Sequence, residues 1–281
     1  MLLGYFSPRD VEHNIAAGPS TLDMRVGETG DQVGTVWFFR TDHAEAVDDA
    51  LADLLTADEL ARADGLRDAQ QRRRWRSSRA CLRLILARVT GESPRRVRFA
   101  NGPLGKPYIA GGLGEVGDGI VFNLSHSADS ALVAVTRHGT IGVDIERMNS
   151  SVEIAILAQQ FFQASEQAWL FGLPPALQMR GFFRLWVLKE AVLKARGTGL
   201  GELERLEIRC GRPLDGRDWV IDDEPAWDLR ELDLDPDFCA AVALPAHVQQ
   251  LRIVETTALE LLSRTGTGDE SRIEHHRRHS R

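Results

Sequence analysis

The segment FNLSHSADSALVAVTRHGTIGVDIE, residues 122–146, indicates the fold most clearly. Near its end Ile141, Val143 and Ile145 alternate with other residues and share one face, as expected for a half-buried strand. A second segment, DPDFCAAVALP at residues 235–245, also ends in a compact apolar strand. Helical patterns precede the strands in each half of the chain. We therefore predict an α+β fold made of two pseudo-symmetric lobes.

The rest of the chain fits this division into two lobes. We predict a loosely ordered lead-in over residues 1–33, an N-terminal lobe over 34–148, a C-terminal lobe over 149–264 and a disordered tail over 265–281. Thr56 predicts a helix start inside the first helical stretch, because a glutamate follows three residues later. The expected helices cover residues 45–64, 67–90, 152–162, 165–171, 179–196 and 256–263, and the expected strands cover 35–40, 96–99, 107–109, 120–123, 131–136, 140–146, 204–208, 218–221, 228–232, 238–244 and 250–255.

The composition is that of a globular protein. Hydrophobic residues make up 43% of the 281 positions and charged residues 27%, which is too apolar for a disordered chain. The three cysteines are scattered without C-x-x-C spacing, which argues against a disulfide framework and a structural zinc site. No apolar run approaches the roughly 18 residues that a membrane span needs, and Arg9, Asp10 and Glu12 stand where a signal peptide would be apolar. We therefore expect a cytoplasmic protein that does not enter a membrane.

The charge is uneven along the chain. A formal net charge of −7 disfavours general nucleic-acid binding. Residues 62–98 nevertheless contain twelve arginines against three acidic residues. Two explanations remain open for this stretch, a specific anionic ligand or a solvated helix face. Only three of the 34 basic residues are lysines, Lys106, Lys189 and Lys194, so these are candidates for sites that need a compact ammonium group.

Two carboxylates stand two residues apart in the predicted strand GVDIE, residues 142–146. Asp144 and Glu146 therefore point to the same side of the strand. Adjacent carboxylates repel each other unless a cation lies between them. A solvent-facing strand explains an isolated pair better, and a third carboxylate nearby would reverse that judgement.

The segment WVLKEAVLKARGTGL, residues 186–200, offers a third carboxylate. Trp186, Glu190 and Lys194 are spaced by four residues and share one helical face. An exposed Glu–Lys pair of this spacing is common, but the segment is otherwise apolar, which indicates a buried helix whose charges need partners. Together with the GVDIE pair, Glu190 would complete an oxygen-rich site that suits Mg²⁺ and a phosphate ligand.

The segments GPLGKPYI, residues 102–109, and FNLSHS, residues 122–127, contain candidate phosphate ligands. Lys106 lies in a turn between glycine and proline, and Ser125 and His126 follow an apolar strand. Short hydroxyls and a cationic imidazole bind phosphates well, although for His126 taken alone a structural histidine is the preferred explanation. The sequence has no P-loop motif and no G-x-G-x-x-G motif.

These motifs, in this order, resemble those of the 4′-phosphopantetheinyl transferases, and specifically the larger Sfp-type class with two lobes in one chain. The resemblance rests on GKP, NLSHS, GVDIE and W-x-x-K-E-A-x-x-K with a following G-x-G, and it covers about residues 50–255. The arginine-bearing stretch LTADELARADGLRDAQQRRRWRSSRACLR is also similar to this family. Val187 departs from the small or polar residue that usually follows the tryptophan, and we expect an effect on packing rather than chemistry.

The resemblance implies an active site in the cleft between the lobes and a role for each candidate residue. Asp144, Glu146 and Glu190 would bind Mg²⁺, or Mn²⁺. Glu190 would also take the proton of the attacking serine, and Lys194 would contact phosphate and stabilise the leaving group. The remaining implied contacts to coenzyme A come from Arg62, Arg74, Arg79, Lys106, Ser125, His126 and Lys189.

The implied reaction moves 4′-phosphopantetheine from coenzyme A to a serine of an apo acyl or peptidyl carrier protein and releases adenosine 3′,5′-bisphosphate. The carrier would belong to fatty-acid, polyketide or nonribosomal-peptide synthesis. A monomer is expected, since the cleft would need no second subunit. Three alternatives remain open: another Mg²⁺-dependent phosphotransferase or phosphohydrolase, a nucleic-acid-binding module built on residues 62–98, and an inactive homologue.

Overall fold

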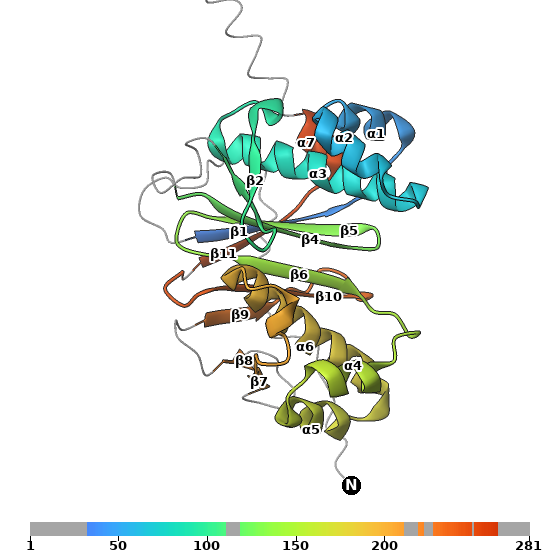
Figure 1. Ribbon diagram of the computed structural model, residues 1–281, viewed down its shortest axis with the longest axis vertical. Coiled ribbons are helices and arrows are strands. Elements are labelled where there is room, and N and C mark those ends of the chain that lie inside the picture. Colours follow the sequence, from blue (N-terminus) through green and yellow to red (C-terminus); the bar gives the residue numbers. More distant parts are fainter. Residues whose placement is uncertain (1–32, 111–118, 211–218, 222–226, 249, 264–281) are drawn as a thin grey trace, which may run out of the picture.

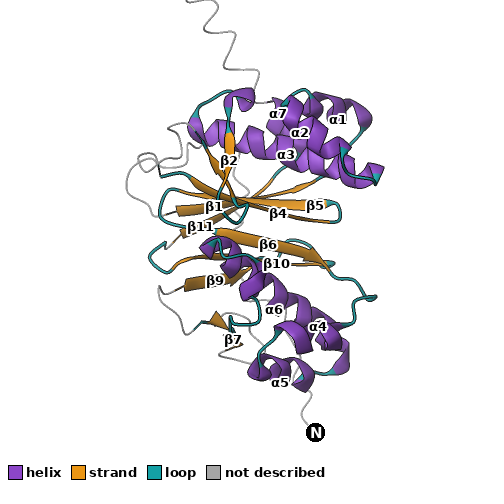
Figure 2. Cartoon of the chain, in the orientation of Figure 1, coloured by secondary structure: helices purple, strands orange, loops and turns teal. Residues whose placement is uncertain are grey.

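A computed structural model describes residues 33–110, 119–210, 219–221, 227–248 and 250–263. The described chain forms four layers, in which two β-sheets face each other between two outer layers of helices (Figures 1 and 2). This arrangement confirms the prediction of a mixed α+β fold. The predicted disordered tail and all but the last residue of the predicted lead-in lie outside the described residues.

The first sheet has four strands in the order β11-β1-β5-β4. Strand β1 runs parallel to β11 and antiparallel to β5, and β5 pairs antiparallel with β4. Helices α1, α2, α3 and α7 cover the outer face of this sheet (Figure 1). The bounds are β1 Val33–Arg40, α1 Glu45–Ala52, α2 Ala57–Asp64, α3 Ala69–Thr90, β4 Val121–Ser127, β5 Ser130–Thr136, β11 Gln250–Glu255 and α7 Ala258–Ser263.

The second sheet has three antiparallel strands in the order β6-β10-β9, with the long helix α6 packed along it. The bounds are β6 Gly142–Arg147, α4 Ile154–Phe161, α5 Ala164–Gly172, α6 Pro175–Arg196, β9 Trp227–Glu231 and β10 Phe238–Pro245. The short elements are η2 Pro94–Arg96, β2 Phe99–Asn101, β3 Pro107–Ile109, η3 Leu200–Glu202, β7 Arg209–Cys210 and β8 Trp219–Val220.

A shared hydrophobic core joins the two sheets. Phe38 of β1 and Leu132 of β5 pack with Ile141, Val143 and Ile145, all of which are buried. The predicted alternation is therefore confirmed, because these three residues line the core while Asp144 and Glu146 lie on the opposite face of β6. Complete burial of each such aliphatic side chain contributes roughly 1.5–3 kcal/mol of transfer free energy, so this core holds the two halves together.

The division by sheets differs from the predicted lobe boundary between residues 148 and 149. Strand β6 belongs to the second sheet, whereas β11 returns to pair with β1 and α7 packs on α3. The return is favourable because β1 would otherwise present an edge of unpaired backbone groups. The helices described here include none that is long and apolar enough to cross a membrane.

A local signal in the sequence determines where helix α2 begins. The predicted helix start at Thr56 is confirmed, because Thr56 and Glu59 form a reciprocal capping box. That start divides the predicted helix 45–64 into α1 and α2. The predicted strand at 204–208 was wrong, since the chain there makes turns and the strand begins only at Arg209.

Gly142 allows helix α6 to cross strand β6 in direct backbone contact. A Cβ atom on Gly142 would lie 2.0 Å from the carbonyl oxygen of Ala191 and 2.4 Å from the amide nitrogen of Ala195. Both distances are far shorter than any van der Waals contact, so only glycine fits at this crossing. The crossing places the last turns of α6 beside the carboxylates of β6.

Candidate active site

Two elements distant in sequence bring four predicted site residues together. Asp144 and Glu146 come from β6, and Glu190 and Lys194 come from the facing turns of α6. The Lys194 ammonium donates to Asp144 Oδ1 at 2.6 Å. Asp144 is 2% exposed, whereas the side chain of Lys194 is 29% exposed, so the ion pair lies at the edge of the buried region. The fold thus brings the carboxylate pair of β6 next to the Glu190–Lys194 face of α6.

Burial and a neighbouring negative charge raise the pKa of the two glutamates of this cluster. Burial, followed by the negative charge of Asp144, raises the pKa of Glu190 to about 7. The same two causes, in the same order, raise the pKa of Glu146 to about 6. Lys194 opposes both shifts without cancelling them. The site therefore contains more negative charge than its single ammonium group compensates.

The donor set of this cluster fits a hard cation. Asp144 Oδ2 is buried and has no hydrogen-bond partner, and within the described chain Glu190 makes no hydrogen bond or ion pair. Buried oxygens without partners are costly, and carboxylate oxygens are the ligands that Mg²⁺ prefers. In the conformation seen here, no three His, Cys, Asp or Glu side chains of the described residues are arranged to ligate a metal. One oxygen of Glu146, Oε2, accepts a hydrogen bond from Ser127.

The hydroxyl of Ser125 is engaged within the protein, by the acidic cluster and by a backbone amide. Its hydroxyl donates to Asp144 Oδ1 at 2.7 Å and accepts from Lys194 Nζ at 3.0 Å and, more weakly, from the amide of Ile145 at 3.4 Å. A hydroxyl has one donor and two lone pairs, so all three are in use. Ser125 is 6% exposed and supports the carboxylate cluster from within.

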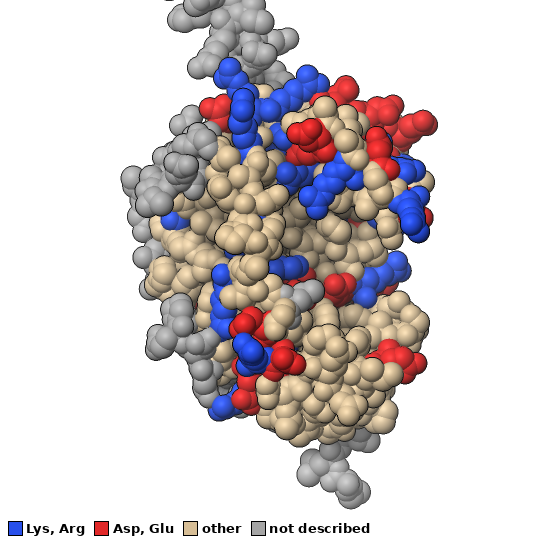
Figure 3. Space-filling model, in the orientation of Figure 1, with Lys and Arg blue, Asp and Glu red and all other residues tan. Residues whose placement is uncertain are grey.

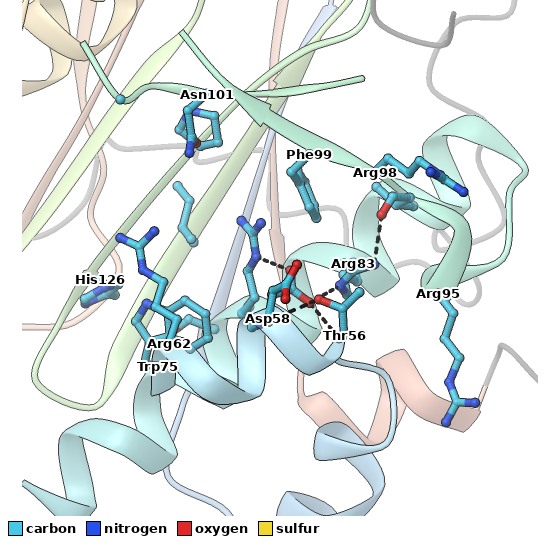
Figure 4. A pocket seen from close by; sticks show the side chains of 17 residues that line it. Thr56, Asp58, Arg62, Trp75, Arg83, Arg95, Arg98, Phe99, Asn101 and His126 are labelled. Atoms are coloured by element: carbon cyan, nitrogen blue, oxygen red, sulfur yellow. Dashed lines mark hydrogen bonds and ion pairs between the residues drawn. The ribbon is translucent and has the colours of Figure 1, made fainter. Parts of the chain in front are cut away.

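Adjacent residues of a strand point to opposite sides, so His126 is directed away from Ser125. It lines a cavity of about 690 Å³ (Figure 4). Removal from water, followed by the positive charge of Lys194, lowers the pKa of His126. Both a neutral and a charged imidazole can donate to an anion. The cavity is lined by Thr56, Asp58, Glu59, Arg62, Trp75, Ser78, Arg79, Arg83, Arg95, Val97, Arg98, Phe99, Asn101, Gly105, Pro107, Leu124 and His126.

Two of the predicted arginines line this cavity. The Arg62 guanidinium lies 5.9 Å from the centre of the Trp75 ring, and that of Arg79 lies 3.8 Å from the centre of the Phe99 ring. Arg79 also donates to Glu59 at 2.6 Å. Guanidinium groups held over aromatic faces are oriented and partly desolvated, which suits the binding of an anionic, ring-containing ligand.

Sequence reasoning missed Trp75 and Phe99. The spacing of Trp75 and Arg79, four residues apart on a helix, was a usable signal that they share a face. Phe99 had no such signal, because it reaches the cavity from a different element, strand β2.

Arg74 lies outside the cavity and forms a bidentate ion pair with Asp42, at 2.8 and 2.7 Å. Arg73 and Arg76 likewise pair with Asp48 and with Asp64. On the face shown in Figure 3, acidic and basic side chains alternate over the helices of the first half and form no uniformly basic surface. The solvated helix face is therefore the better explanation for these three arginines, and the predicted ligand contact of Arg74 needs correction.

Lys106 connects the β2–β3 hairpin to the end of α6. Its ammonium donates to the carbonyl oxygens of Lys194 at 2.6 Å and of Ala195 at 3.2 Å. Thr140 donates to the same Ala195 carbonyl. Burial lowers the pKa of Lys106 to about 8. These two donors satisfy the last carbonyls of α6 and hold the turn that carries Lys194.

Lys189 does not reach the cluster, which corrects its predicted contact with coenzyme A. Its side chain has no exposed surface and donates to Glu166 at 2.6 Å and to the Phe161 carbonyl at 3.1 Å. Burial lowers its pKa in spite of the attraction of Glu166. Glu166 also accepts from the amides of Gln163 and Ile208. Lys189 therefore fastens α5 to α6.

Comparisons with known proteins show the family of the chain. Residues 140–243, which carry β6, α6 and β10, match the family model of the 4′-phosphopantetheinyl transferase superfamily. The chain is 37% identical over 209 residues to the 4′-phosphopantetheinyl transferase HetI of Nostoc, covering 74% of this chain and 86% of that protein. It is 35% identical over 119 residues to the 4′-phosphopantetheinyl transferase gsp of Aneurinibacillus migulanus, covering 42% and 46%. It is 32% identical over 127 residues to AcpT of Escherichia coli, covering 45% and 59%.

The fold, the acidic cluster with its lysine and these similarities define an enzyme of the transferase class. The chain belongs to the 4′-phosphopantetheinyl transferase superfamily.

Proposed function

We propose that this enzyme transfers 4′-phosphopantetheine from coenzyme A to a serine of an apo acyl or peptidyl carrier protein, as a two-lobed, monomeric, Sfp-type transferase. The observation that carries the proposal is the cluster of Asp144, Glu146, Glu190 and Lys194 beside a cavity lined by arginines. In the reaction, a bond forms between the serine oxygen and the β-phosphorus of coenzyme A. The bond from that phosphorus to the bridging oxygen breaks, and adenosine 3′,5′-bisphosphate leaves.

The cavity supplies the binding energy for the nucleotide end of coenzyme A. Arg62, Arg79 and His126 face it with cationic or hydrogen-bonding groups, and phosphate binds such groups through charge-assisted hydrogen bonds. Because Trp75 and Phe99 hold two of the guanidinium groups in place, little side-chain entropy is lost on binding. We propose that these residues bind the 3′-phosphate and position the pyrophosphate toward the acidic cluster.

Asp144, Glu146 and Glu190 would hold Mg²⁺, or Mn²⁺, at the cluster. When bound there, the cation would neutralise charge that develops on the phosphate oxygens. The chain itself supplies the proton transfers. Glu190 would accept the serine proton, and the Lys194 ammonium would stabilise the charge on the leaving group.

Replacing Lys106 with alanine should raise KM for coenzyme A about 10-fold. Two of the three N–H donors of Lys106 go to α6, and we propose that the third contacts a phosphate, where a charged hydrogen bond is worth about 1.5–3 kcal/mol. Steady-state kinetics with varied coenzyme A measures the change.

Thr140→Val is the matched control, because it removes the other donor to the Ala195 carbonyl without removing a charge. This variant should lower the melting temperature and leave KM for coenzyme A unchanged. An unchanged KM in Lys106→Ala would remove Lys106 from the phosphate site.

Intact mass spectrometry of an apo carrier protein tests the proposed function directly. After incubation with the enzyme, coenzyme A and Mg²⁺, the carrier should gain the mass of one phosphopantetheine, and EDTA should abolish the gain. Release of inorganic phosphate without any change in carrier mass, across acyl and peptidyl carriers, would favour a different Mg²⁺-dependent phosphotransferase or phosphohydrolase.

A further inference from the structure

Strands β4 and β6 lie side by side where the two sheets meet, but they belong to different sheets. One edge of β6 pairs with β10, and the amides of Val143, Ile145 and Arg147 face β4. Unpaired amides at a strand edge are costly when buried. Acceptors on β4 other than backbone carbonyls must therefore bind these amides.

Three polar side chains of β4 accept hydrogen bonds from these amides of β6. Asn123 Oδ1 accepts from the amide of Val143 at 3.0 Å, Ser125 Oγ accepts from that of Ile145 at 3.4 Å, and Ser127 Oγ accepts from that of Arg147 at 3.1 Å. The three acceptors are spaced by two residues, so they lie on one side of β4. We call this row, Asn123, Ser125 and Ser127, the seam.

The two serines of the seam also donate to the acidic cluster. Ser125 donates to Asp144, and Ser127 donates to Glu146 Oε2 at 2.7 Å. Each hydroxyl thus fixes a carboxylate and the backbone amide of the next residue at the same time. Asn123 accepts from β6 in the same way but touches no carboxylate of the cluster. A variant at Asn123 therefore serves as a control for a variant at Ser127.

We propose that Ser127 is a positioning residue that holds the Glu146 carboxylate in place for the cation. Asp144 repels Glu146, and within the described chain the hydrogen bond from Ser127 is the one that the Glu146 carboxylate accepts. The Arg147 amide orients the hydroxyl, because an oxygen that accepts from this amide turns its own O–H toward Glu146. This inference rests on the proposed role of Glu146 as a cation ligand.

Binding of Mn²⁺ to the enzyme without coenzyme A tests the proposal. Ser127→Ala should weaken Mn²⁺ affinity about 10-fold, measured by the free-ion signal in electron paramagnetic resonance, since loss of a partner that orients a ligand typically costs 10–100-fold. Ser127→Thr keeps the hydroxyl and should bind within about threefold of wild type. In transfer assays, Ser127→Ala should need more Mg²⁺ for half-maximal rate and should approach the wild-type kcat at saturating Mg²⁺.

Asn123→Ala separates positioning from mere stabilisation of the seam. Both Asn123→Ala and Ser127→Ala should lower the melting temperature, because each removes an acceptor from the seam. Asn123→Ala should leave the Mn²⁺ affinity close to that of wild type. Equal Mn²⁺ affinity in Ser127→Ala and wild type would overturn the inference, as would equal weakening in Asn123→Ala and Ser127→Ala. Absence of Mn²⁺ binding by the wild-type enzyme would overturn the metal assignment itself and this inference with it.

Discussion

Glu190→Gln should lower the rate of phosphopantetheine transfer by at least about 100-fold, because it removes a positioned base and a charged cation ligand together. Glutamine keeps the size of the side chain, so the crossing of α6 over β6 at Gly142 is preserved. Glu190 is 8% exposed and faces Asp144 and Glu146. Removing its charge also lessens the repulsion within the cluster, so the folded protein should be at least as stable as wild type.

Two measurements together check this expectation. Transfer rates at saturating coenzyme A and carrier should fall, while thermal unfolding without added metal should show no loss of stability. Glu255→Gln is the matched control, because it alters the net charge by the same amount at the exposed end of β11. This variant should have wild-type activity. Near-normal turnover of Glu190→Gln would refute both roles proposed for Glu190.

Lys189→Met should lower the free energy of unfolding by about 3–5 kcal/mol, the usual cost of leaving one partner of a buried ion pair uncompensated. Both side chains of the pair with Glu166 have no exposed surface. Methionine fills a similar volume, so the loss would come from the stranded carboxylate rather than from a cavity. Two backbone amides still donate to Glu166 in this variant and limit the loss.

Urea unfolding of Lys189→Met and of the double variant Lys189→Met/Glu166→Gln measures this cost. The double variant should recover part of the stability, because it contains no buried charge at this position. KM for coenzyme A should stay at the wild-type value in the folded protein. A raised KM with unchanged stability would instead support the contact with coenzyme A that the resemblance implied for Lys189.

Lys189 and Ser125 face protein neighbours for simple geometric reasons. Adjacent residues on a helix point about 100° apart, so Lys189 faces α5 while its neighbour Glu190 faces β6. Adjacent residues on a strand point to opposite faces, so Ser125 faces the acidic cluster while His126 faces the cavity. In both cases the periodicity of the helix or strand directs two adjacent residues of one motif toward different neighbours.

The arginine-rich stretch shows where local pattern stops being informative. Arg62, Arg74 and Arg79 all lie in the arginine-rich stretch of residues 62–98. Arg74 nevertheless pairs with Asp42, while the other two line the cavity. The difference depends on the chain before α1 and on strand β2, which contributes Phe99. The spacing of residues within α3 carries no information about Asp42, the partner of Arg74, or about Phe99, the partner of Arg79.

The sequence by itself determined what depends on near neighbours in the chain. These features are the capping box at Thr56, the alternation that puts Asp144 and Glu146 on one side of β6, and the four-residue spacing of Glu190 and Lys194. Backbone geometry sets such relations within a few residues, so they can be read from spacing alone.

Only the tertiary structure decided how these pieces meet. Close packing at Gly142 brings α6 onto β6, the seam joins β4 to β6 through side chains, and β11 returns from the far end of the chain to cover β1. Each of these contacts links residues that are distant in sequence. Their distances are set by the packing of the whole core, in which every side chain must fit at the same time, and no local pattern contains that information.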